Sequence, residues 1–273
     1  MVKYSVSTWI YGEEPLEKSM ERLARLGYDG IEIGGEPRKF TVKEVSRLLE
    51  KYNLEASSIC GIYTNERDLI SCQEKIRRNA IQYVKDCARL ASQIGAGLVI
   101  VVPTAVNKIH PEAPPEQEWK WAIASIREAG EYAAGLGVNL ALEALNRYET
   151  YFVNRIDQLL ELREKVHLDN VQIMVDCFHM NIEEKSLPAT IKRGGEHVIH
   201  VHIADSNRQA AGRGHTDFKA VVNALNSIGY DRYLTMEFLP PAADPYSALK
   251  GARATEFYDL YTSESINHMR ILC

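Results

Sequence analysis

Four residues that could bind a metal or move a proton lie at or near the ends of short apolar runs in the second half of the chain. They are Glu143 after Val138–Leu142, Asp176 after Val171–Val175, His202 within Val198–Ile203, and Glu237 after Tyr233–Met236. Short runs of this kind predict β-strands. A side chain at a strand end is held on a rigid support and still reaches solvent, which suits a metal ligand or a catalytic group.

The alternation of side chains along a strand predicts that these four groups have a common target. Each of the three carboxylates is expected on the face of its strand opposite the bulkier apolar residues. His202 is expected to share its face with Val198 and His200. We therefore expect the four groups to point into one barrel at its C-terminal mouth. His200 lies deeper on the same face and is predicted to be a hydrogen-bonded core histidine.

Three carboxylates and an imidazole would be costly to bury together without a cation. A set of mostly oxygen ligands with one imidazole favours Mn²⁺, Mg²⁺ or Co²⁺ over a structural zinc. Any one of the acidic residues could instead be a helix N-cap. Beyond Asp176, the residues Asn181, Glu183 and Glu184 predict a helix that begins at Asn181.

The elements that must position these residues alternate between strand and helix. Four more strands are expected before them, at Lys3–Thr8, Tyr28–Ile33, Leu54–Ile59 and Gly97–Val102. Helices are predicted at Pro15–Leu26, Thr41–Tyr52, Glu74–Ile94 and about Glu116–Leu136, with helical sequence after each later strand. Eight strand–helix units predict an α/β protein, a single (β/α)₈ TIM barrel over residues 1–273. A doubly wound open sheet is the alternative, but no Gly-x-Gly-x-x-Gly follows the first strand.

Composition and charge argue against several classes of protein. The formal charge of −5 argues against broad binding of nucleic acid or of an acidic membrane. Five cysteines without a Cys-x-x-Cys pair indicate a reduced chain rather than a disulfide framework. The N-terminal sequence does not have the pattern of a signal peptide, and no apolar run approaches ~18 residues. We expect a cytoplasmic protein that does not span a membrane.

Four motifs in order along the chain resemble those of the ketose 3-epimerases, the D-tagatose and D-psicose 3-epimerases of the xylose-isomerase-like sugar isomerase/epimerase superfamily. They are LEALNRYE (Leu142–Glu149), VDCFHMNIEE (Val175–Glu184), HVHIADSNRQAAGRGHTDF (His200–Phe218) and MEF (Met236–Phe238). The resemblance implies one catalytic metal, foremost Mn²⁺, whose ligands are Glu143, Asp176, His202 and Glu237. It also implies that Glu149, His179 and Arg208 contact the substrate.

The implied chemistry is inversion of carbon 3 of a free ketose or a keto-sugar acid. A metal on the oxygens of carbons 2 and 3 acidifies the proton on carbon 3, and Glu143 and Glu237 exchange the roles of base and acid. For Glu149 the alternative is a surface salt bridge with Arg147, and for Arg208 it is a contact with a helix end. Trp9 and Glu32 either line the sugar pocket or pack in the core or rim.

Other functions are weighed by what the sequence lacks. An aldose–ketose isomerase or a hydroxypyruvate-type isomerase is the first alternative, but the Glu-Pro-Lys-Pro segment of the two-metal xylose isomerases is replaced by Glu143-Ala144-Leu145-Asn146. Endonuclease IV needs further histidines at the third and fourth strand ends. A non-catalytic sugar- or metal-binding barrel is the alternative of another class. The segment Gly212-Arg213-Gly214 keeps a phosphate-binding loop, and hence a phosphorylated sugar, as an alternative. The family resemblance implies a homodimer or homotetramer.

Overall fold

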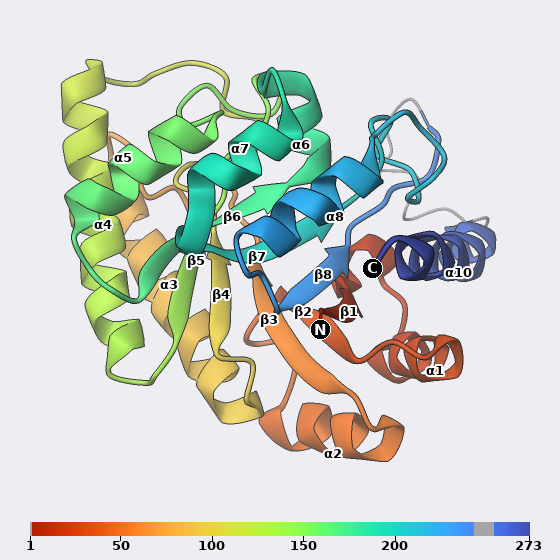
Figure 1. The fold of residues 1–273 in the computed structure, drawn as a ribbon. Helices are drawn as coiled ribbons and strands as arrows, with labels where there is room; N and C mark the ends of the chain where they lie inside the picture. Colours follow the sequence, from red (N-terminus) through yellow and green to blue (C-terminus); the bar gives the residue numbers. More distant parts are fainter. Residues whose placement is uncertain (1, 243–253) are drawn as a thin grey trace.

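A computed structural model describes residues 2–242 and 254–273 as a barrel of parallel strands surrounded by helices (Figure 1). The strands are β1 (Lys3–Val6), β2 (Gly30–Gly35), β3 (Glu55–Gly61), β4 (Leu98–Val101), β5 (Asn139–Leu142), β6 (Val171–Asp176), β7 (Val198–Ile203) and β8 (Tyr233–Met236). Their order is β1-β8-β7-β6-β5-β4-β3-β2, and a parallel bridge between Ser7 and Glu32 joins the two ends. The predicted (β/α)₈ barrel is confirmed.

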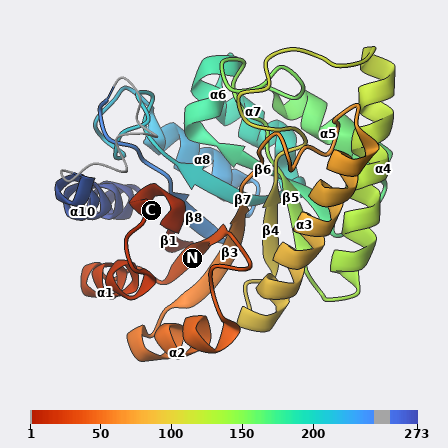
Figure 2. The ribbon, with the colours of Figure 1, turned by 180° about the vertical axis from the view of Figure 1, so that it is seen from behind.

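The helices pack around the outside of the barrel, as the view from behind also shows (Figure 2). They are α1 (Leu16–Leu26), α2 (Val42–Tyr52), α3 (Glu74–Ile94), α4 (Pro115–Ala134), α5 (Ile156–Val166), α6 (Cys177–Glu183), α7 (Leu187–Gly194), α8 (Phe218–Ser227) and α10 (Ala254–Leu272), with short 3₁₀ helices η1 (Thr8–Tyr11) and η2 (Gly195–His197). Local sequence sets several ends: Thr41 caps α2 by accepting the N–H of Glu44, and Gly27 ends α1 with φ +77°. Among the described residues, no helix is long and apolar enough to cross a membrane.

Apolar side chains form two layers on either side of the strands. A large cluster fills the space between strands and helices, while a small one lies inside the barrel. The inner cluster consists of Cys60, Leu98, Ile100, Ala141, Met174 and Ile199. The acidic residues at the C-terminal ends of β5, β6 and β8 lie beyond Ala141 and Met174, so the inner apolar cluster lies below a polar mouth of the barrel.

A bulge in β7 corrects one detail of the predicted strand faces. Ile173 pairs with Val198 and the next residue, Met174, pairs with His200, so Ile199 is the extra residue. Ile199 joins the inner cluster, whereas Val198 belongs to the outer one. The prediction that Val198 shares a face with His200 is therefore wrong, because strict alternation does not hold across a bulge.

The helix after β6 begins earlier than the sequence predicts. Asp176 is the N-cap of α6, and its Oδ1 accepts the backbone N–H of His179 at 2.9 Å. Asn181 consequently lies inside α6, so the predicted start there is wrong. Glu183 instead pairs with Arg147, at 2.7 Å. Asp176 precedes Asn181 in the chain and already accepts an N–H group of the first helical turn, so the helix begins directly after the strand.

Candidate active site

The four predicted groups converge at the C-terminal mouth of the barrel. The Nδ1 atom of His202 lies 3.3 Å from Glu237 Oε1, 3.6 Å from Asp176 Oδ2 and 3.8 Å from Glu143 Oε1. Asp176 ends β6, His202 lies within β7, and the two glutamates directly follow the last residues of β5 and β8. All four side chains are buried. The strand ends thus bring together three carboxylates around one imidazole nitrogen.

Two atoms at the centre of this group are buried without a hydrogen bond in the described part of the chain. They are Asp176 Oδ2 and His202 Nδ1. Burial, together with the nearby charges of Glu237 and Asp176, raises the pKa of Glu143 well above its ordinary value. Buried polar atoms that lack partners are expensive, and a divalent cation would satisfy both of them and relieve the repulsion between the carboxylates. The residues present therefore fit a divalent metal.

A buried carboxylate on β2 fixes the other side of the His202 ring. The Nε2 atom of His202 lies 3.2 Å from Glu32 Oε1 and 3.3 Å from Oε2, and Glu32 is fully buried. Glu32 Oε2 also accepts from Ser58 Oγ at 2.6 Å and lies 2.9 Å from His200 Nε2. His200 is thus a hydrogen-bonded core histidine, as predicted. With its Nε2–H directed at Glu32, His202 turns Nδ1 toward the three carboxylates, and this nitrogen would bind a cation in the neutral form of the ring.

A pocket of about 240 Å³ opens above this group. Its polar lining consists of Glu143, Glu149, His179, Arg208 and Glu237. The remaining lining residues are Trp9, Cys60, Gly61, Ile62, Tyr63, Val102, Val106 and Leu145. The pocket thus unites the predicted catalytic and substrate-contact residues with a largely apolar wall. Its size suits a small molecule.

Arg208 connects two carboxylates of the pocket. Its Nη1 donates to Glu149 Oε1 at 2.9 Å, and its Nη2 lies 3.4 Å from Glu237 Oε2. The guanidinium carbon lies 4.7 Å from the centre of the Phe178 ring. Within residues 2–242 and 254–273, the guanidinium of Arg208 thus contacts pocket carboxylates and an aromatic ring. The alternative of an Arg147–Glu149 salt bridge is wrong, because Arg147 pairs with Glu183.

Asn146 holds His179 in one protonation state. The Nδ1 atom of His179 lies 3.2 Å from the backbone nitrogen of Asn146, which can only donate, so Nδ1 is the acceptor. Burial lowers the pKa of His179, which keeps the ring neutral with its proton on Nε2. The side-chain amide of Asn146 also donates to Glu149, at 3.0 Å. Sequence reasoning missed Asn146, because its partner His179 lies in α6, far away along the chain.

Comparison with known proteins assigns the chain to a family. Residues 20–255 match the model of the xylose isomerase-like TIM barrel. The chain belongs to this family. It is 30% identical over 227 residues to D-psicose 3-epimerase of Ruminiclostridium cellulolyticum, covering 80% of this chain and 76% of that enzyme. It is also 30% identical over 252 residues to 3-dehydro-D-guloside 4-epimerase of Escherichia coli K12, covering 89% and 94%.

Solved structures of such epimerases share the fold. A D-psicose 3-epimerase from Clostridium cellulolyticum H10, solved with D-tagatose, superposes with a TM-score of 0.88 at 24% identity, covering 99% of both chains. A 3-keto-D-glucoside 4-epimerase from E. coli gives 0.81 at 24% identity, covering 95% of this chain and all of that one. The resemblance predicted from the motifs is confirmed, and this family member is an isomerase-class enzyme, an epimerase.

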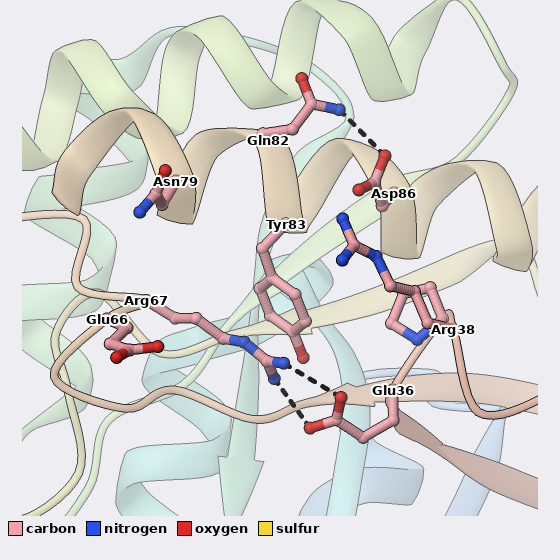
Figure 3. A pocket seen from close by; sticks show the side chains of 9 residues that line it. Glu36, Arg38, Glu66, Arg67, Asn79, Gln82, Tyr83 and Asp86 are labelled. Carbon is pink, nitrogen blue, oxygen red and sulfur yellow. Dashed lines mark hydrogen bonds and ion pairs between the residues drawn. The ribbon is translucent and has the colours of Figure 1, made fainter. Parts of the chain in front are cut away.

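In this epimerase Tyr83, Arg67 and Glu36, three of the residues that line the second pocket drawn in Figure 3, support the loops after β2 and β3. Tyr83 of α3 accepts the N–H of Ile62 at 2.7 Å and donates to the carbonyl of Gly35 at 2.6 Å. Arg67 lies 4.3 Å from the centre of the Tyr83 ring and forms a two-pronged pair with Glu36, at 2.8 and 3.0 Å. The loops after β2 and β3 are thereby tied to α3, which fixes the pocket wall at Ile62.

Proposed function

We propose that this enzyme inverts carbon 3 of a free ketose by removing the proton from one face and returning it to the other. The observation that carries the proposal is the placement of Glu143 and Glu237. They extend from β5 and β8, which β6 and β7 separate in the sheet, and both line the pocket. Two carboxylates on different sides of one pocket provide the base and the acid that inversion requires.

Glu143, Asp176, His202 and Glu237 are proposed to hold one divalent cation, foremost Mn²⁺, with Mg²⁺ or Co²⁺ as alternatives. Support comes from the donor set and from the two orphaned atoms at its centre. When bound, such a cation supplies Lewis acidity, which polarises the carbonyl and makes the proton on the adjacent carbon easier to remove.

Glu143 and Glu237 each hold or accept the proton of carbon 3, with their roles exchanged between the two reaction directions. Trp9 supports this role for Glu237 by donating its Nε1–H to Oε1 at 2.7 Å. On the other oxygen of Glu237 lies Arg208. A carboxylate held on both sides keeps one orientation, so its basic oxygen stays aligned with the carbon throughout turnover.

The substrate's oxygens are proposed to bind Glu149, His179 and Arg208. Neutral His179 offers an Nε2–H donor at the pocket surface, Arg208 offers N–H groups, and Glu149 accepts from hydroxyls. Of the described lining residues, Arg208 is the one with a permanent positive charge, and it already faces two carboxylates. Because two carboxylates already balance the charge of Arg208, the pocket favours a neutral ketose over a keto-sugar acid.

The Gly-rich segment after β7 supports an unphosphorylated substrate. The N–H of Gly212 is donated to Asp205 Oδ2 at 2.8 Å, and that of Arg213 to the carbonyl of Ala210 at 3.1 Å. In the usual phosphate site of such barrels, N–H groups of this loop would bind the phosphate oxygens. Here these two N–H groups already donate to oxygens of the protein itself.

A second candidate is inversion at the carbon next to the ketone of a keto-glycoside. It is favoured by the E. coli 4-epimerase, which this chain matches over 94% of that enzyme's length. The chemistry is shared, since both reactions remove a proton from a carbon adjacent to a carbonyl. The homodimer or homotetramer implied by the family stays a prediction.

Carbon-13 NMR in D₂O with a panel of ketoses, their phosphates, keto acids and 3-keto-glycosides tests the proposal. We expect a free ketose to yield its carbon 3 epimer with deuterium at carbon 3 and none at carbon 1. Deuterium at carbon 1 with an aldose product would show an isomerase instead. Preferential labelling of carbon 4 of a 3-keto-glycoside would establish the second candidate, and a panel without labelling would contradict both.

A further inference from the structure

The segment between β7 and α8 is built around one buried carboxylate. Asp205 is 1% exposed. Its Oδ1 accepts the N–H groups of Ser206 at 2.7 Å and Thr216 at 3.1 Å, and its Oδ2 accepts that of Gly212 at 2.8 Å. Three backbone N–H groups from positions between residues 206 and 216 thus surround a single side chain. This is the geometry of an anion-binding nest with the anion supplied by the chain itself.

Two glycines allow the segment to wrap so closely. Gly212 has φ +93°, and a Cβ there would lie 2.7 Å from His268 Nδ1. A Cβ at Gly214 would overlap Asp205 Oδ1 and Ser206 Oγ. The Gly212-Arg213-Gly214 motif is therefore explained by the enclosure of Asp205.

The enclosed carboxylate is an anion. Burial opposes its ionisation, but hydrogen bonds from backbone N–H groups, those of Thr216 and Ser206 among them, outweigh that effect and lower the pKa of Asp205 below its ordinary value. An ionised acceptor forms stronger hydrogen bonds with N–H groups than a neutral one does. The charge of Asp205 therefore stabilises the closed form of the segment.

The same residue begins the turn that presents Arg208 to the pocket. The N–H of Arg208 donates to the carbonyl of Asp205 at 2.7 Å, and the N–H of Asp205 donates to the carbonyl of Gln209 at 2.9 Å. Arg208 has φ +61°, a conformation that a non-glycine residue adopts rarely and that its surroundings must enforce. The direction of the guanidinium therefore depends on how firmly this turn is held.

Outside the turn, α10 holds the segment at its rim. Tyr261 donates to the side-chain carbonyl of Gln209 at 2.7 Å, and Arg213 pairs with Glu264. Figures 1 and 2 show the segment after β7 lying beside α10 in both views. The Arg213 and Glu264 side chains of this rim are about one-third exposed, whereas Asp205 and Tyr261 are each 1% exposed.

We propose that Asp205 is a positioning residue, a built-in anion that closes the segment after β7 and thereby aims Arg208 at the substrate. The proposal rests on the proposed contact of Arg208 with the sugar. It assigns Asp205 no contact with the substrate or with the metal ligands. Its loss is expected to weaken substrate binding while metal binding persists.

The test is chemical rescue of Asp205→Gly, which removes the carboxylate and leaves room for a small anion. We expect kcat/KM to fall roughly 10- to 100-fold, the range seen when a partner that orients a functional side chain is lost, mainly through KM. Formate, which can fill the nest, should restore much of the loss, and neutral formamide should not. Asp217→Gly is the matched control, because this exposed aspartate caps α8 in the same segment and its loss should leave KM unchanged.

Hydrogen exchange supplies a readout that needs no turnover. The N–H groups of Gly212 and Thr216 should exchange faster in Asp205→Gly and regain protection with formate. Unchanged KM together with faster exchange would overturn the positioning role, and unchanged exchange would overturn the nest itself. If Asp205→Gly does not fold, Asp205→Asn, whose NH₂ group faces N–H donors, takes its place with the same expected KM and exchange changes. A wild-type enzyme inactive on every ketose would refute the proposed function, while the exchange result would still decide on the nest.

Discussion

The two sides of the barrel mouth are built on different principles. From β5 to β8, every strand end carries a charged or imidazole side chain aimed at one point, and Glu32, Asn146 and Asp205 hold those groups or their loops from behind. From β1 to β4, the pocket receives mainly apolar side chains and backbone, with Trp9 as the residue that reaches across to Glu237. One side provides the chemistry and the other shapes the space in which it occurs.

The difference lies in what maintains each side. Charged groups in a buried site need exact partners, since each unpaired one is costly, so the chemical side depends on hydrogen bonds and on a cation. The wall depends on packing and on a brace, Tyr83, that satisfies the backbone at Ile62 and Gly35. Substitutions on the chemical side should therefore reduce metal or substrate binding, whereas substitutions in the wall should mainly reduce stability.

Asp176→Asn should have the largest effect on metal binding. Asparagine can still cap α6 through its side-chain oxygen, so folding should change little, while one ionised ligand is lost. We expect calorimetry to show a loss of affinity beyond the roughly 10- to 100-fold typical of a residue that merely supports a ligand. An unchanged affinity for Mn²⁺ would remove Asp176 from the ligand set.

Glu32→Gln should come next, because it removes the charge that orients His202. We expect metal affinity to fall roughly 10- to 100-fold. Nitrogen-15 NMR of the ring, with Mg²⁺ as a diamagnetic ion, should show that His202 no longer carries its proton exclusively on Nε2. Ser58→Ala, which takes away one hydrogen bond to Glu32 without changing its charge, should have a smaller effect. Equal effects of both variants would contradict the orienting role of Glu32.

Arg208→Ala and His179→Ala should weaken substrate use while leaving metal binding intact. Both groups are proposed to touch substrate oxygens, so kcat/KM should fall by about 10-fold or more, the loss expected for one hydrogen bond to a charged or buried group. Arg147→Ala is the control, since this exposed arginine pairs with Glu183 away from the pocket. Loss of the metal in either test variant would move that residue into the ligand shell.

Tyr83→Phe should have the smallest effect on catalysis and its main effect on stability. It leaves the N–H of Ile62 and the carbonyl of Gly35 without their partner, which should lower the free energy of unfolding by about 1–3 kcal/mol. Denaturant unfolding measures that loss, and Tyr132→Phe, on the helix surface, should lower stability less. A Tyr83→Phe variant that lost metal affinity would contradict the division between the two sides.

The sequence predicted the parts of this molecule that follow from local pattern. The strand runs Val198–Ile203 and Tyr233–Met236 have the predicted bounds, and strand-end positions were enough to predict that Glu143, Asp176 and Glu237 meet, as they do around His202 Nδ1. The bulge at Ile199 could not be predicted, because it depends on the register with β6. The supporting residues were missed or left undecided for the same reason. Glu32 contacts His202 of β7 and Asn146 contacts His179 of α6, and no spacing along the chain indicates such pairs.

The central claim is that Glu143 and Glu237 serve opposite faces of one carbon. Its most direct test is to incubate Glu143→Gln and Glu237→Gln with the ketose that the wild-type enzyme epimerises, in D₂O, and follow both epimers by NMR. We predict that neither variant forms the epimer, and that a variant which still exchanges the proton of carbon 3 does so with retention, because the remaining carboxylate reaches one face. Full epimerase activity in either variant would contradict the two-carboxylate mechanism.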